Sequence, residues 1–301
     1  MGKFLDPFQG FWQNAESGNE EDTVIEIPGL NGEVSVYFDS LQIPHVFSST
    51  EEDLYFTQGY ITARHRLWQM EFQTHAAAGR ISEIIGEAAL DFDRYNRRIG
   101  MVYAAENSLK SIEDDPTAKM VIDNYTNGIN AYIKSLKPKD YPLEYKLLNY
   151  EPELWTNLKS ALLLKYMSKT LNISEKDMEM TNALSVFGKD MLDVLYPDYE
   201  KVGDPIVDKT GDWNFDPIRI DSVPFALPLE LIALHRPEKP SPDVGSNNWA
   251  VSGSKTSTGY PMLSNDPHLT LSLPSIWYIM HLNGPNTNAM GATLPGAPSI
   301  I

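Results

Sequence analysis

The sequence predicts an α+β protein with a helix-rich first part and a β-rich last part. Apolar residues recur with a helical period between residues 51 and 195. Short runs of β-branched and aromatic residues precede residue 49 and follow residue 245. Neither group of strands alone suffices for a sheet with a covered face, so we expect the two parts to form one domain.

Composition indicates an ordered globular protein and argues against nucleic-acid binding and cysteine chemistry. Of the 301 residues, 42% are hydrophobic, which is too many for a disordered chain despite the formal net charge of -17. The charge balance argues against a nucleic-acid partner, because 24 Lys and Arg against 41 Asp and Glu do not readily supply the basic surface that phosphate binding needs. Cysteine is absent, which excludes thiol catalysis, disulfides and thiolate metal sites.

Short β-like runs and one long helix open the chain. Strands are predicted at Thr23–Ile27, Val34–Phe38 and Ile43–Phe47, with Pro44 on a sheet edge. A helix is predicted over residues 51–78, because the hydroxyls of residues 49 and 50 can cap it and three carboxylates follow in its first turn. Gly79 is a plausible interruption after it.

Helices continue to residue 195 and then give way to a proline-rich stretch. The remaining helices are predicted at residues 81–85, 103–112, 117–136, 156–171 and 175–195. Eight prolines between residues 197 and 242 favour an extended connector. Strands follow at residues 249–252, 261–264, 276–282 and 289–293. This pattern divides the chain into residues 1–200, 201–245 and 246–301.

The polar motifs of the long helix do not form a familiar catalytic signature. Arg64, His65 and Arg66 are predicted to form a buried or partly buried ion-pair network with Glu71 that fixes the helix. The sequence contains no HExxH metal motif, no GxSxG nucleophile motif and no phosphate-binding glycine loop. On its own, Gly245-Ser246 is typical of a turn, because both residues are common there.

Several longer motifs resemble the penicillin acylase family and change that interpretation. Three of them resemble the start of its β subunit: Gly245-Ser246-Asn247-Asn248-Trp249-Ala250-Val251, Asn265-Asp266-Pro267-His268-Leu269 and Gly291-Ala292-Thr293-Leu294-Pro295-Gly296-Ala297-Pro298. Residues 58–71 and Gly79-Arg80-Ile81-Ser82-Glu83 resemble its α subunit. The resemblance covers nearly the whole chain in the expected order.

This resemblance implies a self-cleaving precursor of an N-terminal-nucleophile hydrolase with an αββα sandwich fold. Cleavage between Gly245 and Ser246 would release a spacer within residues 201–245. A serine hydroxyl needs a base at neutral pH, and a free α-amine has a pKa of about 7.7 to 8.0. Cleavage would therefore make Ser246 both the nucleophile and, through its α-amine, the base.

The resemblance also implies supporting residues. His268, 22 residues after Ser246, matches a position that helps to orient the serine amine, and Glu179 matches a calcium ligand. Met167, Leu171 and Leu269 fall near the positions that line the acyl-group pocket. Each of these residues also has a simpler interpretation. His268 could be a histidine at a strand end, Glu179 a solvated acid, and the three apolar residues part of the core. Calcium needs six to eight oxygen ligands, of which Glu179 would supply only part. No organic cofactor is implied.

The implied substrate is a small acyl-amide, such as a penicillin, an acyl-homoserine lactone or an acylated peptide. Residues 4–12 resemble a stretch that follows a signal or membrane anchor in many relatives, which implies an extracytoplasmic protein. The donors of the family's oxyanion hole would lie beyond Ile301, so we expect an incomplete sheet and no amidase activity from these residues alone.

Two other functions stay open from the sequence. The chain could be a non-catalytic, uncleaved binding module on an acylase-like scaffold, with Ser246 in a turn. It could also be a conventional serine hydrolase with His268 as base, which predicts activity without cleavage. A new N-terminus at Ser246 would support the self-cleaving hydrolase, whereas both alternatives predict an uncleaved chain.

Overall fold

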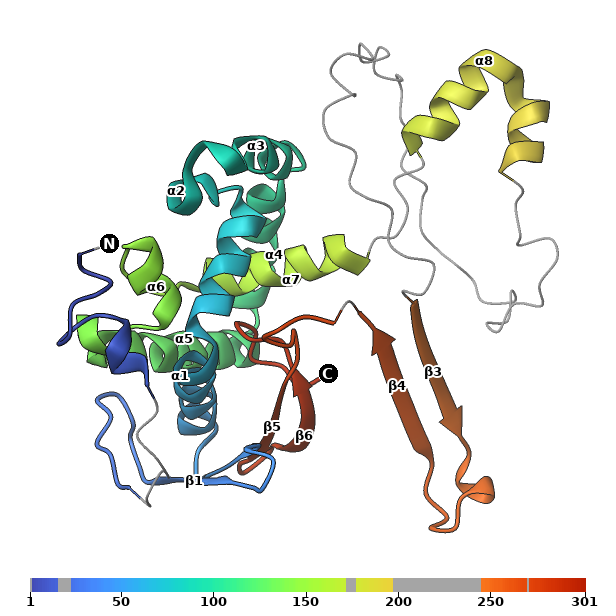
Figure 1. Cartoon of the computed structure of the whole chain (residues 1–301). Coiled ribbons are helices and arrows are strands. Elements are labelled where there is room, and N and C mark those ends of the chain that lie inside the picture. The colour runs from blue at the N-terminus through green and yellow to red at the C-terminus, as the bar shows by residue number, and fades with distance from the viewer. Residues whose placement is uncertain (1, 16–22, 172–176, 197–244, 270) are drawn as a thin grey trace. The chain divides into compact units, whose positions relative to one another are not determined.

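The computed structural model describes residues 2–15, 23–171, 177–196, 245–269 and 271–301, with only the main chain of residues 177–179 (Figure 1). The chain divides into two compact units, one formed by Met1–Thr170 with Pro240–Ile301 and the other by Leu171–Lys239. The described part of the second unit holds helix α8 (Asp177–Leu195), which is broken at Gly188. The proline-rich connector lies outside the described residues.

The first unit combines α-helices with strands from both ends of the sequence, which confirms the α+β class. In chain order its elements are η1 (Phe11–Asn14), β1 (Val34–Phe38), β2 (Pro44–Ser48), α1 (Glu51–Ala78), α2 (Ser82–Ile85), η2 (Gly86–Ala89), α3 (Leu90–Arg98), α4 (Met101–Asp114), α5 (Pro116–Ser135), η3 (Pro138–Asp140), α6 (Leu143–Leu148), α7 (Asn157–Leu171), β3 (Gly245–Val251), η5 (Gly253–Lys255), β4 (Met262–His268), β5 (Tyr278–Asn283) and β6 (Asn288–Thr293).

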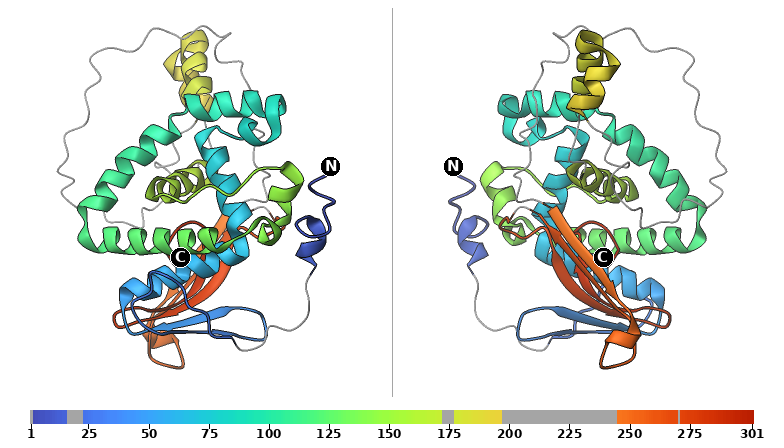
Figure 2. Two further views of the ribbon diagram at one scale, coloured as in Figure 1. Left: turned by 90° about the vertical axis from the view of Figure 1, so that its left-hand side faces the viewer. Right: turned by 90° about the vertical axis from the view of Figure 1, so that its right-hand side faces the viewer.

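Helix α1 begins and ends at the predicted residues. The Thr50 side chain accepts a hydrogen bond from the Asp53 N–H, which satisfies one of the free donors at the helix start. The helix ends at Gly79 (φ 65°), a left-handed conformation that glycine adopts without a steric penalty. Both views in Figure 2 show α1 running from the sheet to α2 and α3.

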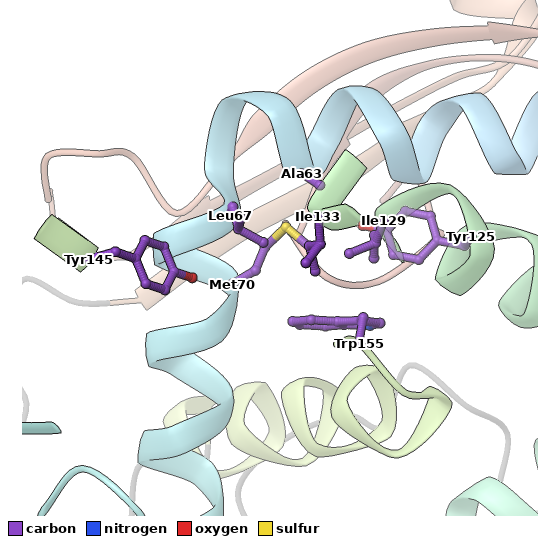
Figure 3. Close-up of a cluster of buried hydrophobic side chains, with 8 residues drawn as sticks. All are labelled: Ala63, Leu67, Met70, Tyr125, Ile129, Ile133, Tyr145 and Trp155. Atoms are coloured by element: carbon purple, nitrogen blue, oxygen red, sulfur yellow. The ribbon is translucent and has the colours of Figure 1, made fainter. Parts of the chain in front are cut away.

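Helices α1 and α5 cross at two glycines. A Cβ atom on Gly59 would overlap the carbonyl oxygen of Tyr125, and a Cβ on Gly128 would overlap that of Phe56. The helix backbones therefore approach so closely that only glycine fits at both positions. The crossing buries a cluster against Trp155 and Tyr145, as Figure 3 shows for Ala63, Leu67, Met70, Tyr125, Ile129, Ile133, Tyr145 and Trp155.

A four-stranded sheet joins the two ends of the sequence in the order β1-β2-β5-β6. The β1–β2 and β5–β6 pairs are antiparallel, whereas β2 and β5 are parallel, with His45 opposite His281 and Phe47 opposite Asn283. One face of the sheet packs on α1 through a buried cluster that includes Val46, Leu54 and Met280. This sheet confirms that the first and last strand groups combine.

Several predicted elements need correction. Residues 23–27 form no strand, and β2 is an interior strand, so the predicted edge position of Pro44 is wrong. Pro44 is nevertheless tolerated because it is the first residue of its strand. Helices α3 and α6 were not predicted, and the strand predicted from Trp249 begins four residues earlier, at Gly245. Among the described residues, no helix is long and apolar enough to cross a membrane.

Candidate active site

Strands β3 and β4 form an antiparallel hairpin that carries Ser246 and His268. The register pairs Gly245 with His268, Ser246 with Pro267 and Asn247 with Asp266. Residues 246–250 are all exposed, and the Trp249 side chain is 53% exposed. The motif that follows Gly245 is therefore a strand rather than a turn, with its polar residues open to other molecules.

The Ser246 hydroxyl contacts the carbonyl of the preceding residue. Its Oγ donates a hydrogen bond to the Gly245 carbonyl oxygen at 2.7 Å. This contact places the hydroxyl beside the peptide bond that joins the two residues. A Cβ on Gly245 would meet no atom within 4 Å, so the α-carbon before the Ser246 peptide bond is open.

The His268 side chain lies on the other face of the hairpin. Residues that are paired across an antiparallel ladder project to the same face, and successive residues alternate. His268 therefore shares a face with Asp266, and its Nε2 lies 2.8 Å from Asp266 Oδ2. The imidazole does not reach the Ser246 hydroxyl, so the hairpin does not support His268 as the base of a conventional serine hydrolase. The main chain of His268 lies opposite Gly245 in the hairpin.

The three residues suggested for an acyl pocket have different environments. Met167 of α7 packs against a buried cluster of Leu163, Leu294 and Ala297, so it is part of the core. Leu171 ends α7 and is 51% exposed, and Leu269 is half-buried directly after β4. The two cavities described in the first unit are lined by other residues.

The suggested calcium ligand Glu179 lies in α8, in the second unit. Its side chain lies outside the described residues, so the structure neither supplies nor excludes its partners. The sequence prediction of a calcium ligand at this position stays a prediction.

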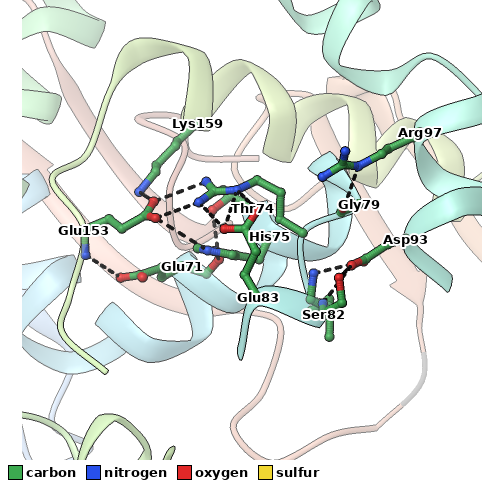
Figure 4. Close-up of polar contacts among 12 residues, drawn as sticks. Glu71, Thr74, His75, Gly79, Ser82, Glu83, Asp93, Arg97, Glu153 and Lys159 are labelled. Carbon is green, nitrogen blue, oxygen red and sulfur yellow. Dashed lines mark hydrogen bonds and ion pairs between the residues drawn. The ribbon is translucent and has the colours of Figure 1, made fainter. Parts of the chain in front are cut away.

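A second polar cluster lies inside the helical part of the first unit, around Glu71 of α1 (Figure 4). Glu71 is 1% exposed, and its Oε2 accepts hydrogen bonds from the Tyr145 hydroxyl at 2.6 Å and from the Glu153 N–H at 3.2 Å. Arg80 Nη2 lies 2.7 Å from Glu153 Oε1, and Lys159 Nζ lies 3.0 Å from Glu153 Oε2. The predicted network of Glu71 with Arg64, His65 and Arg66 is wrong, because Glu71 is held by Tyr145 and by the main chain of Glu153.

Burial and charge pairing shift the pKa values of this cluster in opposite directions. Burial raises the pKa of Glu71 from 4.5 to about 6. The hydrogen bonds from Arg80, together with Lys159, lower the pKa of Glu153 from 4.5 to about 2. Burial also lowers the pKa of His75, whose Nδ1 lies 3.0 Å from the Glu71 carbonyl oxygen.

Glu71, His75 and Glu153 present ligand atoms that all lie within 4.8 Å of one another. A cation there would compete with Arg80 and Lys159, which already pair with both oxygens of Glu153. This cluster is therefore a partly buried ion-pair network that links α1 to the start of α7, and we assign it no metal.

The remaining family motifs have structural roles that sequence reasoning did not identify. In residues 79–83, Arg80 pairs with Glu83 and Glu153, while the Ser82 N–H and hydroxyl donate to Asp93. In residues 291–298, the Gly296 N–H donates to the Tyr125 hydroxyl at 3.0 Å, and Leu294 packs on Leu163. These motifs fix the helices and dock the loop after β6 on α5 and α7. Charged pairs far apart in sequence carry no periodic signal that could have revealed this.

Comparisons with known proteins agree with the motif pattern. The profile of the penicillin amidase family matches residues 33–301. Penicillin acylase 2 proenzyme of Pseudomonas sp. strain SE83 is 30% identical over 91% of this chain and 35% of its own length. Acyl-homoserine lactone acylase QuiP of Pseudomonas aeruginosa is 30% identical over 91% of this chain and 32% of its own length.

A solved structure of a thermostable penicillin G acylase from Alcaligenes faecalis is also similar, with 20% identity and a TM-score of 0.46, over 64% of this chain and 97% of that chain. The chain thus spans about a third of the length of the curated relatives described above. Since the family profile covers the strands, the long helix and the hairpin with Ser246, the chain belongs to the penicillin amidase family.

Proposed function

We propose that the chain carries the nucleophile and the cleavage site of an amide hydrolase that processes itself between Gly245 and Ser246. The observation that carries the proposal is the 2.7 Å hydrogen bond from Ser246 Oγ to the Gly245 carbonyl oxygen, at the start of an exposed strand. Membership in the penicillin amidase family supports it, and so does the similarity to penicillin acylase 2, which is named as a proenzyme.

Self-cleavage uses the Ser246 hydroxyl, the Gly245 carbonyl beside it, and water. Ser246 Oγ attacks the Gly245 carbonyl carbon, the Gly245–Ser246 C–N bond breaks, and the hydroxyl proton passes to the departing nitrogen. The resulting ester is hydrolysed by water, which leaves a carboxylate on Gly245 and a free α-amine on Ser246. The products therefore contain the nucleophile together with an amine of pKa about 7.7 to 8.0, near neutrality.

The same hydroxyl then attacks the carbonyl of a small acyl-amide. The α-amine accepts its proton, an acyl-enzyme forms, the amine product leaves, and water releases the acid. The hairpin register supports a positioning role for His268 through its main chain, because His268 lies opposite Gly245. Met167, Leu171 and Leu269 remain candidates for contacts with the acyl group, with penicillins and acyl-homoserine lactones as the first substrates to test.

Two further parts of the proposal concern the complete protein. Glu179 supplies one carboxylate oxygen to a structural calcium ion, whose remaining ligands come from other residues. Glu179→Gln should then abolish any rise in the thermal midpoint that calcium causes, whereas an equal rise in the variant would refute this role. We also propose an extracytoplasmic location, which cell fractionation tests.

The deciding experiment measures intact mass after expression from the complete gene. We expect two polypeptides, one of which begins at Ser246, and a single uncleaved chain for Ser246→Ala. A matched control is Ser252→Ala, which removes another hydroxyl directly after the same strand and should leave cleavage unchanged. A wild-type protein that stays as one chain would instead favour the uncleaved binding module.

Activity of the 301 residues alone is a separate test. We expect no release of amine from penicillin G or from an acyl-homoserine lactone by the 301-residue chain, because further donors are needed to stabilise the tetrahedral intermediate. Robust turnover by these residues would show that they already contain a complete site.

A further inference from the structure

A pair of histidines joins strands β2 and β5 on the sheet face opposite α1. His45 and His281 are register partners in the parallel ladder, and their Nδ1 atoms lie 3.1 Å apart. The neighbours on this face, Tyr37, Phe47, Ile279 and Met290, are all at least 38% exposed, so solvent ions can reach the pair. The proposed catalytic chemistry uses neither histidine.

The outer nitrogens of both rings have partners that orient them. His281 Nε2 donates to Asn288 Oδ1 at 3.0 Å, and His45 Nε2 lies 3.6 Å from Asp39 Oδ2. Asp39 is itself fixed, because its Oδ1 accepts from the N–H groups of Leu41 and Ile43. Histidines that bind metals almost always use their second nitrogen in this way, with a carboxylate or carbonyl partner.

The inner nitrogens are left facing each other with one proton between them. His281 carries its proton on Nε2, so its Nδ1 is the acceptor and His45 Nδ1 is the donor. Two nitrogens that each lie about 2.0 to 2.1 Å from a tetrahedral Zn²⁺ are about 3.3 Å apart. The observed separation of 3.1 Å is close to that value.

We propose that His45 and His281 bind a divalent transition-metal ion, of which Zn²⁺ is the probe, through their two Nδ1 atoms. The ion replaces the proton between the rings, His45 takes up that proton at Nε2 beside Asp39 Oδ2, and water completes the coordination. The ion thereby ties the N-terminal hairpin β1–β2 to β5. In a chain cut at Gly245–Ser246 it would hold two polypeptides together, and this consequence alone depends on the proposed function.

The test is Zn²⁺ titration of the untagged 301-residue chain by calorimetry, in the Ser246→Ala background so that cleavage cannot affect the result. We expect one Zn²⁺ per chain, and at least a tenfold loss of affinity in His45→Gln and in His281→Gln. His268→Gln is the matched control, because it removes a histidine that is also paired with a carboxylate but has no second imidazole beside it.

Circular dichroism checks that each variant is folded. Asn288→Asp serves as a second test, because a carboxylate at His281 Nε2 should raise Zn²⁺ affinity. No Zn²⁺ binding by the folded parent, or equal binding by the parent and both histidine variants, would overturn the proposal. If the histidine variants do not fold, unchanged affinity in Asn288→Asp overturns it. Loss of Zn²⁺ binding in His268→Gln would also overturn the proposal, because the ion would then bind at the β3–β4 hairpin.

Discussion

Helix α1 and the hairpin β3–β4 both carry family motifs, but their side chains have opposite environments. In α1, Gln58, Glu71 and Met70 are each at most 1% exposed, whereas Ser246, Asn247 and Asn248 of β3 are exposed. Gln58 and Glu71 of α1 face other parts of the same chain. The polar residues of the hairpin are open to other molecules.

This difference separates structural motifs from reactive ones. A buried carboxylate such as Glu71 is held by Tyr145 and by the main chain of Glu153, so it stabilises a particular packing of α1. A nucleophile must reach a substrate, and the hydroxyl of Ser246 is exposed. We therefore expect substitutions in α1 to change stability and substitutions in the hairpin to change chemistry.

The largest expected effect on stability comes from a buried apolar side chain of α1. Leu54→Ala should lower the free energy of unfolding by about 2 to 5 kcal/mol, because Leu54 is fully buried between α1 and the sheet. Leu263→Ala in β4 is the matched control, since Leu263 is 81% exposed and its loss should cost less than about 0.5 kcal/mol. Urea denaturation measures both, and equal costs would contradict the comparison.

The second-largest expected effect on stability comes from the hydrogen bond between Tyr145 and Glu71. Tyr145→Phe removes the hydrogen bond to Glu71 Oε2 and leaves a buried carboxylate with fewer donors. We expect a loss of about 1.5 to 3 kcal/mol, the range for hydrogen bonds to charged groups. Tyr260→Phe is the control, because Tyr260 is 75% exposed. If both variants have the same unfolding midpoint, the network does not stabilise α1.

The raised pKa of Glu71 predicts a pH dependence of stability. Between its unfolded pKa of 4.5 and its folded value of about 6, the folded chain binds more protons at this group. The Glu71 contribution to the free energy of unfolding is therefore full below pH 4.5 and falls as the pH rises to about 6, by about 2 kcal/mol.

Urea denaturation of the parent chain and Glu71→Gln between pH 4.5 and 7 isolates this contribution. The same titration of both proteins is needed because the lowered pKa of His75 acts in the opposite direction in part of that range. Glu153, whose pKa is lowered, loses its contribution only as the pH falls from 4.5 towards about 2. Identical pH profiles for the two proteins would contradict the assignment to Glu71.

The smallest expected effect concerns His268. His268→Gln should change the free energy of unfolding by less than about 0.5 kcal/mol, because the His268–Asp266 pair is exposed. Cleavage at Ser246 should also proceed, because the imidazole faces away from the hydroxyl. Mass spectrometry checks this, and complete loss of cleavage in a folded variant would restore His268 as a side-chain participant.

Much of the fold was predictable from local patterns. The capped start of α1, its end at Gly79 and the strands at both ends of the chain follow from residue types and their spacing. Residues 23–27 were mispredicted because their β-like composition finds no neighbouring strand. Helices α3 and α6 were not predicted because they are short, with 9 and 6 residues, and local propensity says little about such segments.

The candidate site was predictable only through the family motifs. Ser246 and His268 were identified as residues, but no pattern within the sequence indicates that their side chains project to opposite faces, because this depends on the register of the hairpin. The partners of Glu71 lie 74 and 82 residues away, and the His45–His281 pair spans 236 residues. Such contacts arise from tertiary packing.

The central claim is that Ser246 attacks the Gly245 carbonyl, and an ester or thioester at this bond is its direct signature. In Ser246→Cys, expressed from the complete gene, the introduced thiolate should form a thioester with Gly245, which hydroxylamine cleaves. We predict one fragment that ends in a hydroxamate at Gly245 and a second fragment whose N-terminus is the substituted residue. A folded Ser246→Cys protein that hydroxylamine leaves intact at the bond after Gly245 would contradict the account.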